Sequence, residues 1–155
     1  MRNVTLCFLI DGDSVCLAMK KRGFGQGKWN GVGGKVEEGE SIKQAALREL
    51  REEIGVETDE EHMKNMGNIR FSFNGKPDFS QHMHIFFIRK WRGEPKESDE
   101  MEPKWYKKDS LPYDDMWIGD KYWLPKALGD QRIEGEFHFN AHGNKILKFD
   151  LRDVE

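Results

Sequence analysis

The sequence has little cysteine and no long apolar segment. Its 155 residues include only two cysteines, Cys7 and Cys16. Both stand alone in strand-like segments without the spacing of zinc ligands, so we expect reduced thiols in or near the core and no disulfide. The longest largely apolar run near the N-terminus, residues 4–10, is too short for a membrane span and lacks the flanks of a signal peptide. We therefore expect a cytoplasmic protein with no membrane partner.

The sequence also lacks an excess of positive charge. Lys and Arg number 25 against 28 Asp and Glu, which gives a formal net charge of −3. A surface that coats nucleic acid needs clustered surplus cations, so this balance argues against a nucleic-acid partner. A small phosphate-bearing molecule is compatible with it, because a metal ion and a few local cations can hold phosphates. We expect a monomer that binds a small molecule.

The composition is otherwise typical of a globular chain. Hydrophobic residues make up 37% and charged residues 34%, and the aromatic residues include ten Phe and five Trp. Such a chain has enough apolar surface to fold, unlike a disordered one. Its length predicts one domain, residues 1–155, with a single core of ordinary size.

Hydrophobic patterns predict strands that alternate with turns and two helices. Residues 5–10 and 15–19 form a hairpin around 11–14, and the glycine-rich stretch 20–30 is a loop. Strands follow at 69–73 and 82–88, then an acidic loop at 93–103 and a short strand from 105. A helix over 120–128 and a closing hairpin of 137–139 with 146–149 complete the chain. This mixture predicts an α/β/α layered sandwich with a central mixed sheet.

The clearest local signal is a capped helix in the first half of the chain. Ser41 followed by Gln44 is typical of a capping box, and Gly55 is typical of a helix end. Within the helix, Glu49, Glu52 and Glu53 are spaced i, i+3 and i+4, so their carboxylates gather on one face. Clustered carboxylates suit Mg²⁺ or Mn²⁺. The alternative for such a string alone is a solvated acidic helix face.

The residues around this helix extend it into a longer pattern. The pattern reads Gly34, five residues, Glu40, seven residues, Arg48-Glu49-Leu50, one residue, Glu52-Glu53, one residue, Gly55-Val56. It resembles the Nudix box position for position. So many fixed positions make the match specific, and the expected context of a glycine turn before a capped helix is present. The resemblance implies a Nudix-type α/β/α sandwich, which agrees with the predicted elements.

Further segments resemble one branch of that family. They are MKKRGFGQGKWNGVGGK at 19–35, ESDEM at 97–101, DMW at 115–117 and DKYW at 120–123. Together they are similar to the MutT-homologue branch, the oxidised purine nucleoside triphosphate diphosphohydrolases. The resemblance implies Mg²⁺-dependent hydrolysis of triphosphates of the 8-oxo-dGTP type to the monophosphate and pyrophosphate, which sanitises the nucleotide pool.

The resemblance also implies roles for particular residues. The catalytic set is Arg48, Glu49, Glu52 and Glu53. The three glutamates would hold Mg²⁺, with Glu100 from the acidic loop and the backbone at Gly33. Metal ions of this kind neutralise a triphosphate and activate water. Either Glu52 or Glu53 could instead act on the attacking water, and for Glu100 the alternative is a solvated loop acid.

For the purine base, the resemblance implies a pocket with aromatic walls and a few polar groups. The walls would be Phe24, Phe71, Phe73, Trp117 and Trp123; Asn30 and Asp120 would bind the base, Thr5 would lie at the floor and Lys20 near the entrance. Each has a plain structural alternative. The aromatic rings could be core residues, Thr5 an ordinary strand residue, Lys20 a surface cation and Asn30 a turn residue.

Two departures from the branch bear on substrate range. Well-known members carry two adjacent aspartates after the Trp, whereas this chain has Gly119 before Asp120. Two neighbouring carboxyls can share one proton and exchange donor and acceptor roles, which lets several modified bases fit. We expect 8-oxo-dGTP-type guanines to remain substrates while the range over modified adenines narrows or shifts. Gln81 and His82 occupy a more apolar region of the branch and could alter a pocket wall.

Three other functions fit parts of the pattern. The chain could be a Nudix hydrolase for a methylated purine triphosphate, a dinucleoside polyphosphate or ADP-ribose. It could be a nucleotide sensor with an inactive site, although a binding module does not need the complete glutamate set. An acidic interaction module would show no Mg²⁺ dependence at all.

Overall fold

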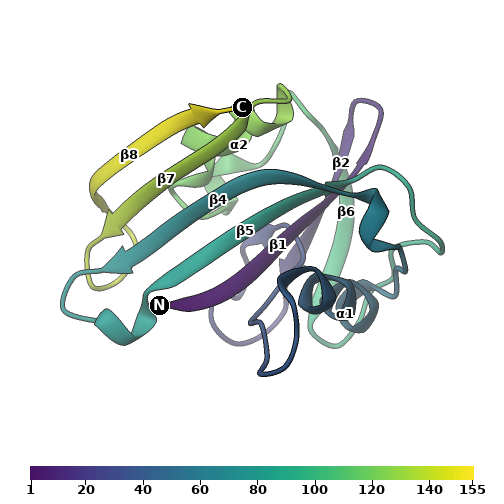
Figure 1. Ribbon diagram of the computed structural model, residues 1–155, viewed down its shortest axis with the longest axis horizontal. Coiled ribbons are helices and arrows are strands. Elements are labelled where there is room, and N and C mark those ends of the chain that lie inside the picture. Colours follow the sequence, from purple (N-terminus) through teal and green to yellow (C-terminus); the bar gives the residue numbers. More distant parts are fainter.

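A computed structural model describes residues 1–155 as one mixed β-sheet with a helix on each face (Figure 1). The strands follow the order β3-β2-β1-β5-β4-β7-β8, and β6 also pairs with β2. They are β1 (Arg2–Asp11), β2 (Ser14–Lys20), β3 (Trp29–Asn30), β4 (Met63–Phe73), β5 (Gln81–Ile88), β6 (Met101–Lys107), β7 (Arg132–Phe139) and β8 (Ile146–Val154). The helices are α1 (Ile42–Ile54) and α2 (Asp120–Leu128), with short 3₁₀ helices η1 (Glu60–His62), η2 (Pro77–Phe79) and η3 (Tyr113–Asp115). None of these helices combines the length and hydrophobicity needed to cross a membrane.

The two faces of the sheet support two hydrophobic clusters. Along β1, Leu6, Phe8 and Ile10 join the cluster that contains α2 residues, whereas Cys7 and Leu9 join the one that contains α1 residues. A strand buried on both faces is apolar at consecutive positions rather than at alternate ones. In Figure 1, α1 lies in front of the sheet and α2 behind it. The predicted α/β/α sandwich with a central mixed sheet is confirmed.

Both cysteines lie in the α1-side cluster and neither forms a disulfide. Cys7 is 1% exposed and Cys16 is 2% exposed, and both are free thiols. Burial raises the pKa of the Cys7 thiol far above its ordinary value, and it raises that of Cys16 to about 11. The prediction that both cysteines lie in or near the core is confirmed.

Strand pairing explains why the sheet is mixed. β1 pairs with β5 and β4 with β7 in parallel, while the β1–β2, β4–β5 and β7–β8 pairs are antiparallel. The predicted first hairpin is confirmed, with Asp11 paired to Ser14 across its turn. The predicted closing hairpin is confirmed by the pairing of Phe137 with Phe149.

Several predicted strands are longer in the structure than in the sequence analysis. β4 begins at Met63, not at residue 69, because the residues from Met63 on also pair with β5. A bulge at Gly67 interrupts this pairing; its φ is 113° and its N–H donates to Asn65 Oδ1 at 2.8 Å. Polar residues and a glycine weaken the local strand signal there, and pairing with β5 overrides it. β6 likewise begins inside the predicted acidic loop and tolerates Pro103. The predicted loop 20–30 ends in the short strand β3.

Candidate functional site

The glycine turn after β3 approaches β1 and α1 at backbone distance. The N–H of Thr5 donates to the Gly34 carbonyl at 2.9 Å. A Cβ at Gly33 would lie 1.8 Å from the Thr5 carbonyl oxygen, and one at Gly34 would lie 2.6 Å from Glu49 Oε1. Gly33 has no room for a side chain against the β1 backbone, and a side chain at Gly34 would displace the Glu49 carboxylate, so the turn brings bare backbone against α1.

Helix α1 begins and ends where its capping residues predict. The N–H of Gln44 donates to Ser41 Oγ at 3.1 Å, and the N–H of Ser41 donates to Gln44 Oε1 at 2.9 Å. Gly55 ends the helix in the left-handed conformation with a φ of 69°. Ala46, Leu50 and Ile54 are buried on one side of the helix. This anchoring fixes the direction of the three predicted glutamates.

Arg48 organises the acidic side of α1. Its Nε and Nη2 donate to the two carboxylate oxygens of Glu40 at 2.7 and 3.0 Å. Its Nη1 reaches Glu49 at 2.9 Å and Glu52 at 3.2 Å, and its Nη2 also donates to the Lys35 carbonyl at 3.1 Å. The hydrogen bonds to Arg48 hold the pKa of Glu40 below its ordinary value. Arg48 therefore positions two of the predicted metal ligands and ties them to the glycine turn.

Glu53 is the buried member of the carboxylate group. It is 8% exposed, and its Oε2 has no hydrogen-bond partner. Burial is the main cause that raises its pKa to about 8, and the neighbouring Glu49 carboxylate adds to it by charge and by a hydrogen bond. Glu100 raises the pKa further by its charge, whereas Lys20 lowers it. An acid whose pKa is raised by neighbouring carboxylates lies close to them.

The acidic loop is tied to the end of α1. Ser98 Oγ donates to the Glu53 carbonyl at 2.7 Å, and the Ser98 N–H donates to the Met101 carbonyl at 2.9 Å. Glu100 follows in this turn, pairs with Arg22 at 3.5 Å and acts on Glu53 electrostatically. The structure thus brings Glu100 toward the helix glutamates, as the sequence predicts.

This donor set fits a hard divalent cation. Three α1 carboxylates and Glu100 supply oxygen atoms, one of the buried oxygens is unpaired, and bare backbone at Gly33 and Gly34 lies beside them. Mg²⁺ and Mn²⁺ prefer such oxygen ligands, and the positive charge of a bound cation would offset both the burial and the neighbouring carboxylates that raise the pKa of Glu53.

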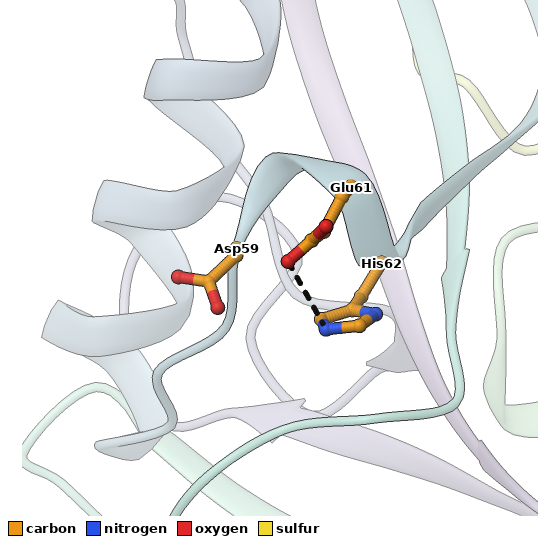
Figure 2. A group of neighbouring side chains, drawn as sticks. All are labelled: Asp59, Glu61 and His62. Carbon is orange, nitrogen blue, oxygen red and sulfur yellow. Dashed lines mark ion pairs between the residues drawn. The ribbon is translucent and has the colours of Figure 1, made fainter.

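A second group of possible metal ligands lies elsewhere, beside η1. The ligand atoms of Asp59, Glu61 and His62 lie within 4.8 Å of one another (Figure 2). Asp59 is already paired with Arg92 at 3.0 and 3.4 Å, and Glu61 lies 3.7 Å from His62 Nε2. Asp59 and Glu61 are exposed. The group could hold a metal ion, but it contains no residue of the predicted site.

A cavity of about 530 Å³ adjoins the glycine turn. It extends from Gly33, Gly34 and Lys35 to the region before α2. Most of the residues predicted to bind substrate line it, namely Thr5, Lys20, Phe24, Asn30, Phe71, Phe73, Trp117 and Asp120. The structure therefore brings together residues that are far apart in the sequence.

Aromatic rings form two walls of this cavity. Phe24 and Trp117 pack with ring centroids 5.2 Å apart. Phe139 stacks on Phe71 at 5.8 Å and on Phe73 at 5.4 Å. Phe24 is 66% exposed, so its ring lies at the mouth of the cavity and is free to contact a ligand. A flat aromatic ligand has stacking partners on both walls.

Asp120 provides a buried polar group in this aromatic setting. It is 4% exposed; its Oδ1 accepts a hydrogen bond from Trp123 Nε1 at 3.1 Å, and its Oδ2 has no partner. Burial raises the pKa of Asp120 to about 7, although the bond from Trp123 and the charge of Lys28 lower it in part. The carboxyl can therefore hold or release a proton near neutral pH.

Two residues occupy places that differ from the sequence analysis. Trp123 does not line the cavity but is fully buried in the α2-side cluster, because its indole N–H turns to Asp120. His82 is not a cavity residue either; it lies opposite Asn3 and hydrogen-bonds Asn68. Side chains alternate along β5, so Gln81 and Met83 line the cavity instead.

Asn30 combines its two predicted roles. Its Oδ1 accepts from the Gly31 N–H at 2.8 Å, which is a turn contact, while the residue lines the cavity. The sequence analysis missed Phe139, Met83 and Lys28 as lining residues. Phe139 lay in a predicted strand, but only the parallel pairing of β7 with β4 reveals its direction.

Comparison with known proteins places this site in a family. The model of the NUDIX domain matches residues 1–127. Over 152 residues the chain is 46% identical to the oxidized purine nucleoside triphosphate hydrolase of Danio rerio, covering 98% of this chain and 95% of the relative. It is 44% identical over 154 residues to the Mus musculus protein of the same name, covering 99% and 96%.

Solved structures agree with this assignment. A MutT mutator protein from Bacillus halodurans superposes with a TM-score of 0.84 at 31% identity, covering 97% of each chain. The two relatives and this structural match cover nearly the whole chain, and the family model covers the glycine turn, α1 and every cavity residue except Phe139. The chain belongs to the Nudix hydrolase family.

Proposed function

We propose that the chain hydrolyses oxidised purine nucleoside triphosphates of the 8-oxo-dGTP type to the monophosphate and pyrophosphate, and so sanitises the nucleotide pool. The observation that carries the proposal is the continuity of the site. One cavity runs from the glycine turn beside the α1 carboxylates to the aromatic walls around Asp120. One nucleotide can therefore place its triphosphate at the glycine turn and its purine base at the aromatic walls. The names of the fish and mouse relatives support the same substrate class.

We propose Mg²⁺ as the cofactor, with Mn²⁺ as a substitute. Glu49, Glu52 and Glu53 would hold it together with Glu100 and the Gly33 backbone. When bound, such a cation neutralises phosphate charge and lowers the pKa of attacking water. The chain's own part is to keep these oxygens in place, and Arg48 does so through its bonds to Glu49 and Glu52.

The glutamates also offer a proton acceptor for the attacking water. Burial and the neighbouring Glu49 carboxylate raise the pKa of Glu53 to about 8, so Glu53 can take up a proton near neutral pH, and its Oε2 has no other partner. Glu52 is the other candidate, and Arg48 holds it on the exposed side of the helix. In either arrangement, Glu53 is required as ligand or as base.

At the other end, the base would stack between the two aromatic walls and meet Asp120. A carboxyl whose pKa is about 7 can donate its proton to a base oxygen or accept a bond from a base N–H. The amide NH₂ of Asn30 is a second group for the purine edge. A polar group left unpaired by the wrong base costs about 1 to 3 kcal/mol, which gives the pocket its selectivity.

Because Gly119 stands where the related branch has a first aspartate, Asp120 is the one acid of this pair that can bind the base. A Cβ at this position would lie 3.4 Å from the Phe137 ring and 3.7 Å from Phe139, which is ordinary contact. We propose that Asp120 alone supports 8-oxo-guanine recognition while the range over modified adenines narrows.

The deciding experiment is kcat/KM with Mg²⁺ for 8-oxo-dGTP, dGTP, 2-oxo-dATP and a methylated purine triphosphate, with a metal-free control. We expect a preference for 8-oxo-dGTP over dGTP of more than about tenfold, which corresponds to one pocket hydrogen bond. Mg²⁺-dependent turnover without that preference would assign the chain to another Nudix substrate, such as ADP-ribose or a dinucleoside polyphosphate. Binding without turnover would assign it as a nucleotide sensor.

We propose a cytoplasmic monomer, which size-exclusion chromatography and localisation of a tagged chain would test.

A further inference from the structure

The β5 strand has a polar side that the nucleotide cavity does not use. Gln81 and Met83 line the cavity, whereas His82 and His84 alternate with them and lie on the opposite face of the sheet. In Figure 1, α1 covers this face near the far end of β1, and the segment of β5 beside the N-terminus lies away from the helix. Both histidines are partly exposed there.

Their hydrogen bonds orient both rings. His82 Nε2 lies 2.8 Å from Asn68 Oδ1, and His84 Nε2 lies 3.0 Å from Asn3 Oδ1. The two ring centroids are 4.3 Å apart. An amide oxygen only accepts hydrogen bonds, so each Nε2 carries the proton of a neutral ring and each Nδ1 keeps a free lone pair.

Burial, assisted by the positive charge of Arg70, keeps these rings neutral. Burial is the main cause that lowers the pKa of both, and it lowers the pKa of His84 to about 4 with help from His82 and Arg70. Arg70 also lowers the pKa of His82, while Glu134 raises it. A neutral imidazole is the form that binds metals, so this pair is in the ligating state at neutral pH.

We propose that His82 and His84 form a binding site for a divalent transition-metal ion that prefers imidazole, such as Zn²⁺, Ni²⁺ or Cu²⁺. The ligands are the two Nδ1 atoms, with water completing the coordination. The Asn68 and Asn3 oxygens accept from the opposite ring nitrogens, an arrangement that commonly fixes metal-binding histidines. Imidazole nitrogen suits these ions, whereas the oxygen-rich α1 site suits Mg²⁺. The site lies on the back of the strand that provides Gln81 and Met83 to the cavity.

The test is calorimetric titration of the untagged chain with Ni²⁺ in excess Mg²⁺, without nucleotide, so that it does not depend on the proposed activity. We expect one Ni²⁺ site that H84A and H82A weaken by at least about tenfold. N68A should weaken it by about tenfold through loss of ring orientation. R70Q should strengthen it by about twofold, because it removes a nearby positive charge.

The matched control is H62A, which removes the histidine of the exposed group in Figure 2. H62A should leave the Ni²⁺ affinity unchanged, and thermal melts confirm that each variant is folded. If an alanine variant fails to fold, H84Q replaces it. Absence of Ni²⁺ binding, a site lost in H62A, or a site that survives in the folded H82A/H84A double variant would overturn the proposal.

Discussion

Glu53 and Asp120 are two buried acids that serve two different parts of the site. Each has one carboxylate oxygen without a partner, and burial raises the pKa of Glu53 to about 8 and that of Asp120 to about 7. Their neighbours differ. Glu53 lies beside Glu49 and near Glu100, whereas Asp120 accepts from Trp123 and faces aromatic rings. An unpaired oxygen among acids is satisfied by a cation, and an unpaired oxygen among rings is satisfied by a hydrogen-bonding base.

The largest expected effect is at the acidic end. E53Q keeps the shape of the side chain but removes the charge, so turnover of the preferred triphosphate should fall by about 10²- to 10⁴-fold. The free energy of unfolding should not fall, because a neutral amide replaces a buried carboxyl whose raised pKa of about 8 already keeps it largely protonated at neutral pH. Steady-state kinetics with a Mg²⁺ titration measures this. E57Q is the control, because Glu57 is exposed and lies just beyond the end of α1. An E53Q variant with full activity would show that Glu53 has no catalytic role.

The second-largest effect is on the pH dependence of the free energy of unfolding, and it arises from Asp120. In the unfolded chain, Asp120 ionises near the ordinary aspartate pKa of 3.8, whereas in the folded protein burial raises its pKa to about 7. The folded state therefore holds the extra proton between these values, and the free energy of unfolding falls as pH rises through this window. D120N has no ionisable group at this position and so does not lose this stability. The difference in the free energy of unfolding between D120N and the parent chain should therefore grow from pH 4 to pH 7 and level off above, at an upper limit on the order of 4 kcal/mol.

Urea unfolding at several pH values measures this advantage. D114N is the control, because Asp114 is exposed on η3 and should give no pH-dependent difference. A D120N curve parallel to that of the parent chain would show that Asp120 ionises normally.

A smaller effect is expected from the aromatic wall. W117A removes one stacking surface, which should lower kcat/KM for a purine triphosphate by about tenfold to a hundredfold, mainly through KM. Trp105 provides the control, since it stacks on Trp91 at 5.9 Å outside the cavity. If W105A and W117A behave alike, the loss is one of stability rather than of base stacking.

The smallest effect concerns substrate range. G119D should raise the activity on 2-oxo-dATP relative to 8-oxo-dGTP by about threefold to tenfold, because a second acid next to Asp120 offers a further donor and acceptor. G119A separates the carboxylate from the added Cβ. An unchanged profile across the substrate panel would show that one acid already provides the full range.

The acidic end could be predicted because its signals are local. Ser41, Gln44 and Gly55 define the ends of α1 by contacts within a few residues, and helical spacing then fixes which glutamates share a face. Even the close approach of Gly33 and Gly34 follows from their being glycines. The structure adds the partners of Arg48, which come from Glu40 and Lys35 across the turn.

The aromatic end could be predicted only through family resemblance, because its residues meet through strand pairing. The side of the sheet on which Phe139 or Met83 lies depends on register, and one residue of slip would reverse it. The bulge at Gly67 shifts the register of β4 against β5 in a way that no local pattern indicates. Trp123 illustrates the same limit, since its N–H could face a ligand or Asp120 equally well by sequence.

The buried thiols bear on how such a protein withstands the conditions that create its proposed substrates. Oxidants that damage nucleotides also attack cysteine, and they react with the thiolate rather than the thiol. The pKa of both Cys7 and Cys16 is raised by burial, so almost no thiolate exists at neutral pH and little of either side chain is reachable. The glutamates of the proposed metal site have no redox chemistry of their own. The fold thus offers peroxide no reactive sulfhydryl through which to inactivate the enzyme.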